Sequence, residues 1–313
     1  MKPFISVIIC THNPRRDYLH LVIKALEDQN LPYTDWELLV IDNASETPIA
    51  WEWSIDWHPQ GQIIREEKVG LTAARLCGFQ AAQGEVLVFV DDDNLLSSNY
   101  LLEVQGVFQQ HLQIGAIGGK SVPRFEITPE PWMAEFYKVL AIRDFGELVQ
   151  VSEALRSDEP IVYPDFAPAG IGLAIRREVF GAYVAQTQDV LARLALGRTG
   201  KQLTSGEDND IVLTAMRQGW QVGYFPKLEV VHLIAANRLK WNYLARLNKA
   251  ATRSWVQVLG IHDVQLWPSI SPWTVLPRKV KAFFAYGAWR NAAAYVRWRG
   301  ACGLYEALAS GVE

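Results

Sequence analysis

Cysteine is scarce in this sequence of 313 residues, which contains only Cys10, Cys77 and Cys302. Three scattered thiols cannot form a disulfide framework, and they lack the spacing of a zinc site. We therefore expect a protein adapted to a reducing compartment.

Long apolar runs are also missing, since none reaches the ~18–20 residues that span a bilayer. The first apolar stretch, Phe4–Cys10, is too short for the core of a secretory signal, and no small-residue cleavage motif follows it. These absences predict a cytoplasmic protein. With 50% hydrophobic and 20% charged residues, the composition is that of a globular chain and excludes disorder as the dominant state.

Several well-known enzyme motifs are absent. There is no G-x-G-x-x-G after an expected strand and no G-x-x-x-x-G-K-[ST], which argues against a dinucleotide-binding fold and against a P-loop enzyme. No G-x-S-x-G nucleophile motif is present either.

The net charge of −4 hides an asymmetry between two parts of the chain. Residues 1–233 carry 19 basic and 31 acidic side chains, whereas residues 234–313 carry 11 basic and 3 acidic ones. The acidic main part opposes nucleic-acid binding. The basic tail is rich in Trp, which suits contact with the inner face of a membrane. Helices that pack on the main domain, or a self-association surface, are the preferred interpretation of this tail.

The first 120 residues alternate between buried-strand and helix patterns. Apolar strands are expected at Phe4–Cys10, Glu37–Ile41 and Val86–Val90, with a weaker one at Gln62–Arg65. Amphipathic or Ala-rich helices are expected over about residues 15–29, 70–83 and 98–111. This alternation predicts a mostly parallel, doubly wound α/β sheet flanked by helices.

Polar clusters follow three of these strands, at Thr11–Asn13, Asp42–Asn43 and Asp91–Asn94. Ligands of such sheets bind outside the carboxyl ends of the strands, so we expect one site rather than three unrelated loops. The later part is less regular: residues 123–168 are rich in prolines and aromatics. A Gly-containing strand is expected at Ala169–Ile175, a helix at Glu207–Gln218, and strands at Gln221–Phe225 and Leu228–His232.

Two acidic clusters are candidates for chemistry. The triplet Asp91–Asp93 offers the oxygen ligands that Mg²⁺ or Mn²⁺ prefers, but a solvated turn explains it equally well. The run Gly206–Asp210 holds more acids than a helix start needs, and one of them could be a general base toward a sugar hydroxyl. His232 could complete the coordination of a cation only if it meets the triplet in space. Arg75 and Lys68 flank Gly70 at the start of an expected helix. They could bind an anion there, or they could be solvated cations beside an ordinary glycine turn.

Taken in order over about residues 4–233, these motifs resemble those of the family 2 glycosyltransferases. Ser6–Asn13 looks like the family's first strand and T-x-N loop, Glu37–Ser45 like its second strand, and Val88–Asp93 like its D-x-D motif. Further matches are Gly70–Gly78, Ala169–Gly172 followed by Arg176–Arg177, Gly206–Asp208, Gly219–Trp220, Pro226 and His232.

The resemblance implies a GT-A fold and a role for each matched residue. Asp208 would be the catalytic base, with Glu207 holding the acceptor or orienting the base. The metal, Mg²⁺ or Mn²⁺, would be held by Asp93 and Asp91, with His232. The nucleotide-sugar would be held by Thr11, Asn13, Asp42, Arg75, Asp91 and Asp92.

The implied protein is an inverting glycosyltransferase that moves a sugar from a nucleotide-diphosphate donor, UDP-type favoured, to a hydroxyl of a glycan or lipid-linked acceptor. Polysaccharide or other cell-envelope glycan synthesis is the expected setting. Residues 1–234 would form the catalytic domain, with a nucleotide-binding half (1–120) and an acceptor-binding half (121–234), and residues 235–313 a mainly helical C-terminal extension. A sugar nucleotidyltransferase and a non-catalytic nucleotide- or glycan-binding protein are the alternatives.

Overall fold

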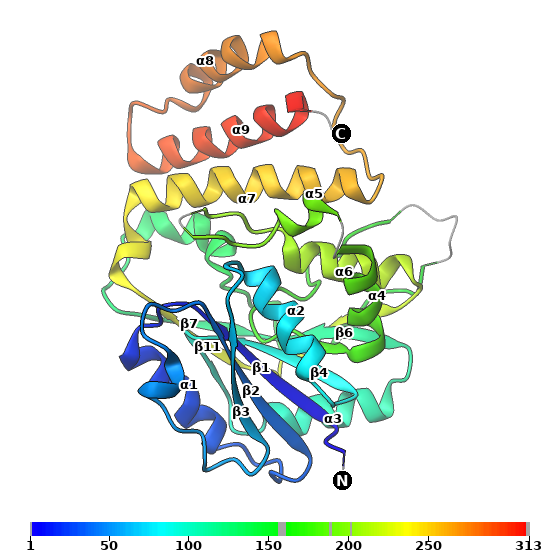
Figure 1. Cartoon of the computed structure of the whole chain (residues 1–313). Coiled ribbons are helices and arrows are strands. Elements are labelled where there is room, and N and C mark those ends of the chain that lie inside the picture. The colour runs from blue at the N-terminus through cyan, green and yellow to red at the C-terminus, as the bar shows by residue number, and fades with distance from the viewer. Residues whose placement is uncertain (1, 156–160, 188–189, 201, 311–313) are drawn as a thin grey trace.

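A computed structural model describes residues 2–155, 161–187, 190–200 and 202–310 of the chain. Its centre is an eight-stranded sheet with the strand order β3-β2-β1-β4-β9-β6-β10-β8. The domain ranges predicted from the sequence, 1–234 and 235–313, also contain the few residues that the structure does not describe. Figure 1 shows the sheet flanked by helices, with further helices stacked at the end of the molecule opposite the N-terminus.

The first half of the sheet is parallel, as predicted. It consists of β1 (Ile5–Thr11), β2 (Trp36–Asn43), β3 (Gly61–Glu66) and β4 (Val86–Asp91). β1 pairs with β2 on one side and with β4 on the other, and β3 pairs with the far side of β2. The helices α1 (Arg16–Glu27) and α2 (Leu71–Ala81) connect these strands. Because the strand order reverses between β1 and β4, the carboxyl ends of these two strands border the crevice where such sheets bind ligands.

Alternate side chains of these strands enter two cores, because successive residues of a strand point to opposite faces. Ile5, Val7 and Ile9 pack with α1 and with α3 (Tyr100–Gln110) on one face. On the other face, Ile8 and Phe89 pack in a second core with α2, α4 (Arg177–Thr187) and α6 (Glu207–Arg217). The continuous apolar runs of the sequence are therefore strands buried on both faces.

The second half of the sheet is mixed. The short strand β9 (Ala174–Arg176) lies antiparallel to both β4 and β6 (Ile114–Gly118). Beyond β6, β10 (Gln221–Tyr224) pairs in parallel and β8 (Gln150–Val151) pairs antiparallel to β10. The strand expected at Ala169–Ile175 is thus wrong in extent, because its first residues form a loop in which Gly172 has φ +66°.

A separate three-stranded sheet was not predicted. Its strands are β5 (Asn94–Leu96), β11 (Val230–Ile234) and β7 (Ser121–Phe125), with β11 in the middle. The pairing of β11 with β5 sets His232 opposite Asn94, directly after the acidic triplet. Residues more than 130 positions apart in the chain are brought together by this small sheet.

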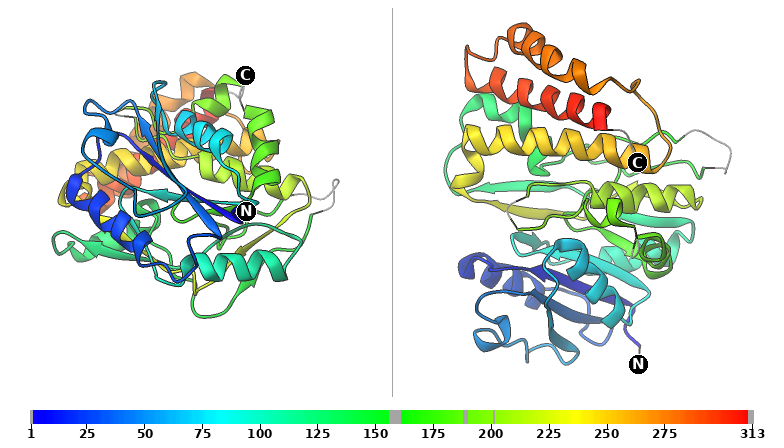
Figure 2. Two further views of the ribbon diagram at one scale, coloured as in Figure 1. Left: turned by 60° about the horizontal axis from the view of Figure 1, so that its bottom comes forward. Right: turned by 45° about the horizontal axis from the view of Figure 1, so that its top comes forward.

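The C-terminal residues form three helices, α7 (Trp241–Ile261), α8 (Val275–Tyr286) and α9 (Ala292–Ser310). Figure 1 and the right view of Figure 2 show α7 nearest to the sheet, α9 beyond it and α8 outermost. A third core joins α7 and α9 to the 3-10 segment η2 (Pro131–Leu140). None of the described helices is both long and apolar enough to cross a bilayer. The short elements are η1 (Ile49–Trp51), α5 (Leu191–Leu194), η3 (Ala236–Leu239) and η4 (Pro272–Thr274).

Candidate active site

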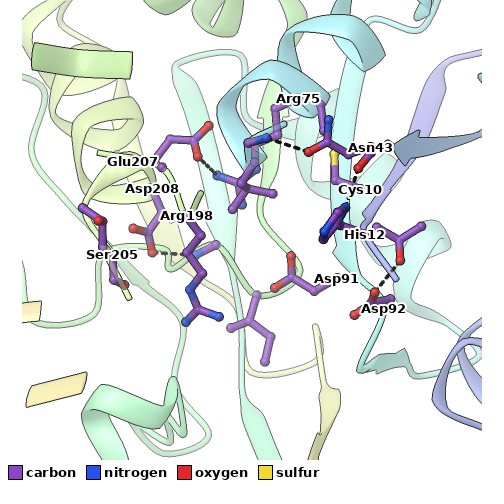
Figure 3. Close-up of a pocket in the computed structure, with 18 of the residues that line it drawn as sticks. Cys10, His12, Asn43, Arg75, Asp91, Asp92, Arg198, Ser205, Glu207 and Asp208 are labelled. Carbon is purple, nitrogen blue, oxygen red and sulfur yellow. Dashed lines mark hydrogen bonds and ion pairs between the residues drawn. The ribbon is translucent and has the colours of Figure 1, made fainter. Parts of the chain in front are cut away.

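A cavity of about 330 Å³ opens at the carboxyl edge of the sheet. The ends of β1 and β4 form one wall, and the loop that precedes α6 together with the start of that helix forms the facing wall. Figure 3 shows Glu207 and Asp208 on one side of the cavity and Asp91 and Asp92 on the other, with Arg75 between them. The two acidic clusters of the sequence therefore face a single space.

Each acid of the triplet has a different partner. Asp92 accepts a hydrogen bond from the Thr11 hydroxyl, and Asp91 accepts one of 3.1 Å from the Asn94 amide. Desolvation and the nearby charge of Asp93 raise the pKa of Asp91, and they raise the pKa of Asp92 to about 7. Two of the three carboxyls thus resist ionisation unless positive charge arrives beside them.

Asp93 already has that positive charge. Its carboxylate lies 2.8 Å from Arg238 Nη1 and 3.4 Å from His232 Nε2. Desolvation opposes the ionisation of Asp93, but the His232 hydrogen bond and the Arg238 charge outweigh it and hold its pKa below the ordinary value. The meeting of His232 with the triplet, on which the sequence-based metal hypothesis depended, is present in the fold.

The residues implied as metal ligands suit Mg²⁺ or Mn²⁺ in kind but are not assembled around one point. Asp91 and Asp93 offer carboxylate oxygens and His232 an imidazole nitrogen, which these cations accept. Within the described residues, however, no three His, Cys, Asp or Glu side chains are grouped closely enough to hold an ion. A bound cation would have to share or replace the contact of Arg238 with Asp93.

The facing wall begins with the first turn of α6. Asp208 Oδ2 accepts a hydrogen bond of 2.9 Å from the Gly170 backbone amide, which fixes the direction of the carboxylate. Glu207 is 3% exposed and forms an ion pair with Arg75, at 3.4 Å. Burial raises the pKa of Glu207, although the charge of Arg75 opposes this. Both acids thus line the cavity, with Asp208 partly exposed and Glu207 buried against Arg75.

The third acid of this helix start serves another purpose. Asp210 is fully buried, 3.0 Å from Arg193 and 2.7 Å from His262 Nε2, and it does not line the cavity. It joins α6 to α5 and to the end of α7. The surplus of acids in the sequence therefore has two explanations, one at the cavity and one in the core.

Two predicted nucleotide ligands do not line the cavity: Asp42 is buried and Asn13 is exposed. The oxygens of Asp42 accept hydrogen bonds from the Ser45 and Ile49 amides, and one oxygen also pairs with Arg65 at 2.9 Å. Although desolvation opposes it, these bonds hold the pKa of Asp42 below its ordinary value. Asn13 accepts a hydrogen bond of 2.8 Å from the Glu46 amide. Both side chains brace the loop after β2, and their contact with a nucleotide stays a prediction.

Asn43, Arg198 and Arg238 line the cavity, although the sequence analysis assigned none of them a role in the site. Asn43 Oδ1 accepts a hydrogen bond of 2.7 Å from the amide of Gly70, whose φ of +141° favours glycine. Arg198 points into the cavity (Figure 3). Only Asn43, at the end of a predicted strand, carried a sequence signal that could have identified it.

Comparisons with known proteins agree with this arrangement. Residues 6–159 match the family model described as Glycosyl transferase family 2. Glycosyltransferase AglE of Haloferax volcanii is 33% identical over 94 residues, which is 29% of this chain and 31% of that protein. The glucosyl-dolichyl phosphate glucuronosyltransferase of the same organism is 22% identical over 251 residues, covering 77% of this chain and 72% of that protein. The match thus spans about a third of the first relative and most of the second.

Among solved structures, the crystal structure of S. aureus TarS residues 1–349 superposes with a TM-score of 0.51 at 12% identity, covering 98% of this chain and 90% of that one. A structure of the same fragment in complex with UDP superposes equally well. At this identity the likeness concerns the fold, which is of the GT-A type with additional C-terminal helices. The family match, together with the motifs and their place in this fold, identifies residues 6–159 as a glycosyl transferase family 2 domain.

Proposed function

We propose that this protein transfers a sugar from a nucleotide-diphosphate sugar to a hydroxyl acceptor, with inversion at the anomeric carbon. The observation that carries the proposal is the single cavity lined by both Asp91–Asp93 and Glu207–Asp208. A UDP-type donor is favoured because the TarS fragment, which shares the fold, was crystallised with UDP. A glycan or lipid-linked acceptor is favoured because one relative is named a glucosyl-dolichyl phosphate glucuronosyltransferase. Another, from Bacillus subtilis and 29% identical over 96 residues, is named a putative teichuronic acid biosynthesis glycosyltransferase.

The donor would occupy the wall formed by the ends of β1 and β4. Thr11 and Arg75 line it, and Arg198 adds a cation that points into the cavity. Arginine is well suited to a diphosphate because its planar group donates several hydrogen bonds to phosphate oxygens. Asp91 and Asp93, with His232, would hold Mg²⁺ or Mn²⁺. When bound, that cation would neutralise charge on the departing diphosphate.

The acceptor would approach from the side of α6. Asp208 would take the proton of the acceptor hydroxyl as that oxygen forms its bond to the anomeric carbon and the bond to the diphosphate breaks. The start of a helix stabilises a carboxylate in its charged form, which is the form that a base needs. Glu207, through its ion pair with Arg75, would fix the position of the first turn of α6 relative to the donor wall.

Thermal unfolding with a panel of nucleotide-sugars, in Mn²⁺ and in EDTA, tests the donor. We expect one UDP-sugar to raise Tm in Mn²⁺, by an amount that corresponds to about 2.7 kcal/mol at a hundredfold excess over Kd. The stabilising donor is then incubated with candidate acceptors, and the anomeric configuration of the product is read by NMR. No stabilisation by any nucleotide-sugar, or retention of configuration, would contradict the proposal.

A further inference from the structure

The outer face of α8 is an apolar stripe that nothing in the described chain covers. Leu276, Val280 and Phe284 are 70%, 50% and 64% exposed, and their spacing of four residues sets them on one side of the helix. Trp273 before the helix and Trp289 after it are 91% and 54% exposed. Such a run of large exposed side chains marks a contact surface.

The next face around the same helix packs on α9. Ala282 is buried, and the Phe283 ring lies 5.2 Å from the Trp298 ring of α9 in an edge-on contact. Trp298 Nε1 also donates a hydrogen bond of 2.9 Å to the Lys279 carbonyl. Phe283 and Trp298, which composition alone would assign to a membrane surface, therefore hold α8 on α9. The outer stripe consists of other residues.

The stripe is bordered by positive charge. Arg278, Lys281 and Arg290 are exposed, and no carboxylate pairs with any of them in the described part of the chain. The nearby carboxylate of Glu306 already forms ion pairs with Lys249 Nζ at 2.8 Å and with Lys279 Nζ at 2.6 Å. Viewed along the helix axis, Lys281 and Arg278 lie beside the apolar stripe. The exposed surface of α8 therefore has an apolar face and a neighbouring cationic face.

The position of α8 leaves this surface accessible. It forms the outermost layer of the molecule, beyond α9 and α7, at the end opposite the N-terminus (Figures 1 and 2). None of the stripe residues lines the cavity described above. A large, flat partner could therefore reach the stripe without touching the acidic clusters.

We propose that the outer face of α8, with Trp273 and Trp289 at its two ends, docks on the surface of an anionic lipid bilayer. An amphipathic helix whose apolar stripe is flanked by Trp and by cations binds at the level of the lipid headgroups, through apolar burial and attraction to anionic lipids. A second copy of the chain fits less well, because a two-fold contact would bring two sets of unpaired cations together. The docking needs neither donor nor acceptor.

Flotation of the full chain with lipid vesicles tests this surface. We expect binding to equimolar phosphatidylcholine–phosphatidylglycerol vesicles at low salt, and little binding to pure phosphatidylcholine. The double variant Leu276→Ser/Phe284→Ser should lower the partition coefficient by more than about tenfold, because it removes two side chains that would be buried. Arg278→Gln/Lys281→Gln should lower binding several-fold and weaken its salt dependence.

A matched control is offered by Leu112→Ser/Leu148→Ser, since these side chains are 72% and 78% exposed elsewhere on the molecule. It should bind vesicles like the unchanged protein, and all variants should keep the same Tm. The proposal is overturned if the unchanged protein does not float, or if the control loses as much binding as the α8 variant. It is also overturned if sedimentation shows a dimer that Leu276→Ser/Phe284→Ser dissociates while vesicle binding persists.

Discussion

At the scale of single residues, the three acids in the first turn of α6 have three different surroundings, although the sequence presents them as one cluster. Asp208 lies at the cavity, Glu207 is buried against Arg75, and Asp210 is enclosed by Arg193 and His262. Environment rather than residue type therefore separates a candidate base from a structural ion pair.

We expect Asp208→Asn to reduce the turnover number by about 10²–10⁴, the range attributed to a positioned general base. The amide keeps the shape of the side chain but cannot accept the proton. Donor-induced stabilisation in Mn²⁺ should remain, because the donor wall is unchanged. Steady-state kinetics and thermal unfolding measure the two properties. Turnover at the original rate would remove Asp208 from the role of base.

Asp210→Asn, two positions along the same helix, is the matched control and should have the opposite effect. Loss of its charge leaves Arg193 buried without a countercharge, which typically costs about 3–5 kcal/mol. Urea unfolding should show this loss, while turnover per folded molecule stays close to that of the unchanged protein. A large loss of turnover without loss of stability would show that the two acids had been assigned the wrong way round.

His58 gives a prediction on pH. Its ring is 3% exposed and packs edge-on at 4.1 Å from the Trp36 ring, and burial lowers its pKa to about 4 from an ordinary 6.5. Between these two pH values His58 binds a proton in the unfolded chain but stays neutral in the folded chain. Stability is therefore lost as the pH falls from about 6.5 to about 4, by up to about 3 kcal/mol from this residue.

His58→Asn cannot take up that proton and can still accept the hydrogen bond from the Gln60 amide. Urea unfolding of both proteins at pH 7 and pH 4 should show that the unchanged protein loses more free energy of unfolding than the variant. An equal loss in both would mean that His58 is protonated in the folded state.

At the scale of secondary-structure elements, the crossing from the large sheet to the small one depends on Gly119, between β6 and β7. A methyl group there would collide with the Leu228 carbonyl and lie 2.6 Å from the Phe225 carbonyl oxygen. Because backbone cannot move aside cheaply, we expect Gly119→Ala to cost about 1–3 kcal/mol or more. Gly106→Ala, in α3 with no atom within 4 Å, should instead stabilise by about 0.5–1 kcal/mol. Thermal unfolding of both variants checks the contrast.

The same scale shows which elements a sequence can predict. The strands β1, β2 and β4 are continuous apolar runs buried on both faces, so their pattern is strong and their ends were placed within one or two residues. β5 and β7 were missed because β5 is short and begins with a polar residue and β7 contains Pro123. Both are strands only because they pair with β11. The Gly170–Gly172 loop looked like a strand because small apolar residues fit either conformation.

At the scale of the whole molecule, the C-terminal helices are part of the packed structure around the site. Met133 and Phe136 of η2 share a core with Leu244, Leu247 and Val296. Arg238, beyond the predicted boundary at residue 234, pairs with Asp93 across 145 positions of sequence. A contact that distant leaves no local pattern, which is why the sequence indicated the acids and not their arginine.

We therefore expect a fragment ending at residue 234 to be unstable. It would expose the apolar partners of several fully buried side chains of α7, each worth about 1.5–3 kcal/mol, against a typical total of about 5–15 kcal/mol. Circular dichroism and thermal unfolding of the fragment, compared with the full chain, measure this. A fragment that melts cooperatively at the same temperature would show that residues 1–234 fold independently.

The placement of β9 has a consequence for synthesis of the chain. β4 is complete at residue 91, but the strand that covers its open edge ends only at residue 176. At about 5–20 residues per second, a ribosome needs roughly 4–17 seconds to add the intervening segment. During that interval the nascent protein presents an uncovered apolar edge to its neighbours, so its yield in the cell should depend on chaperones that shield the growing polypeptide.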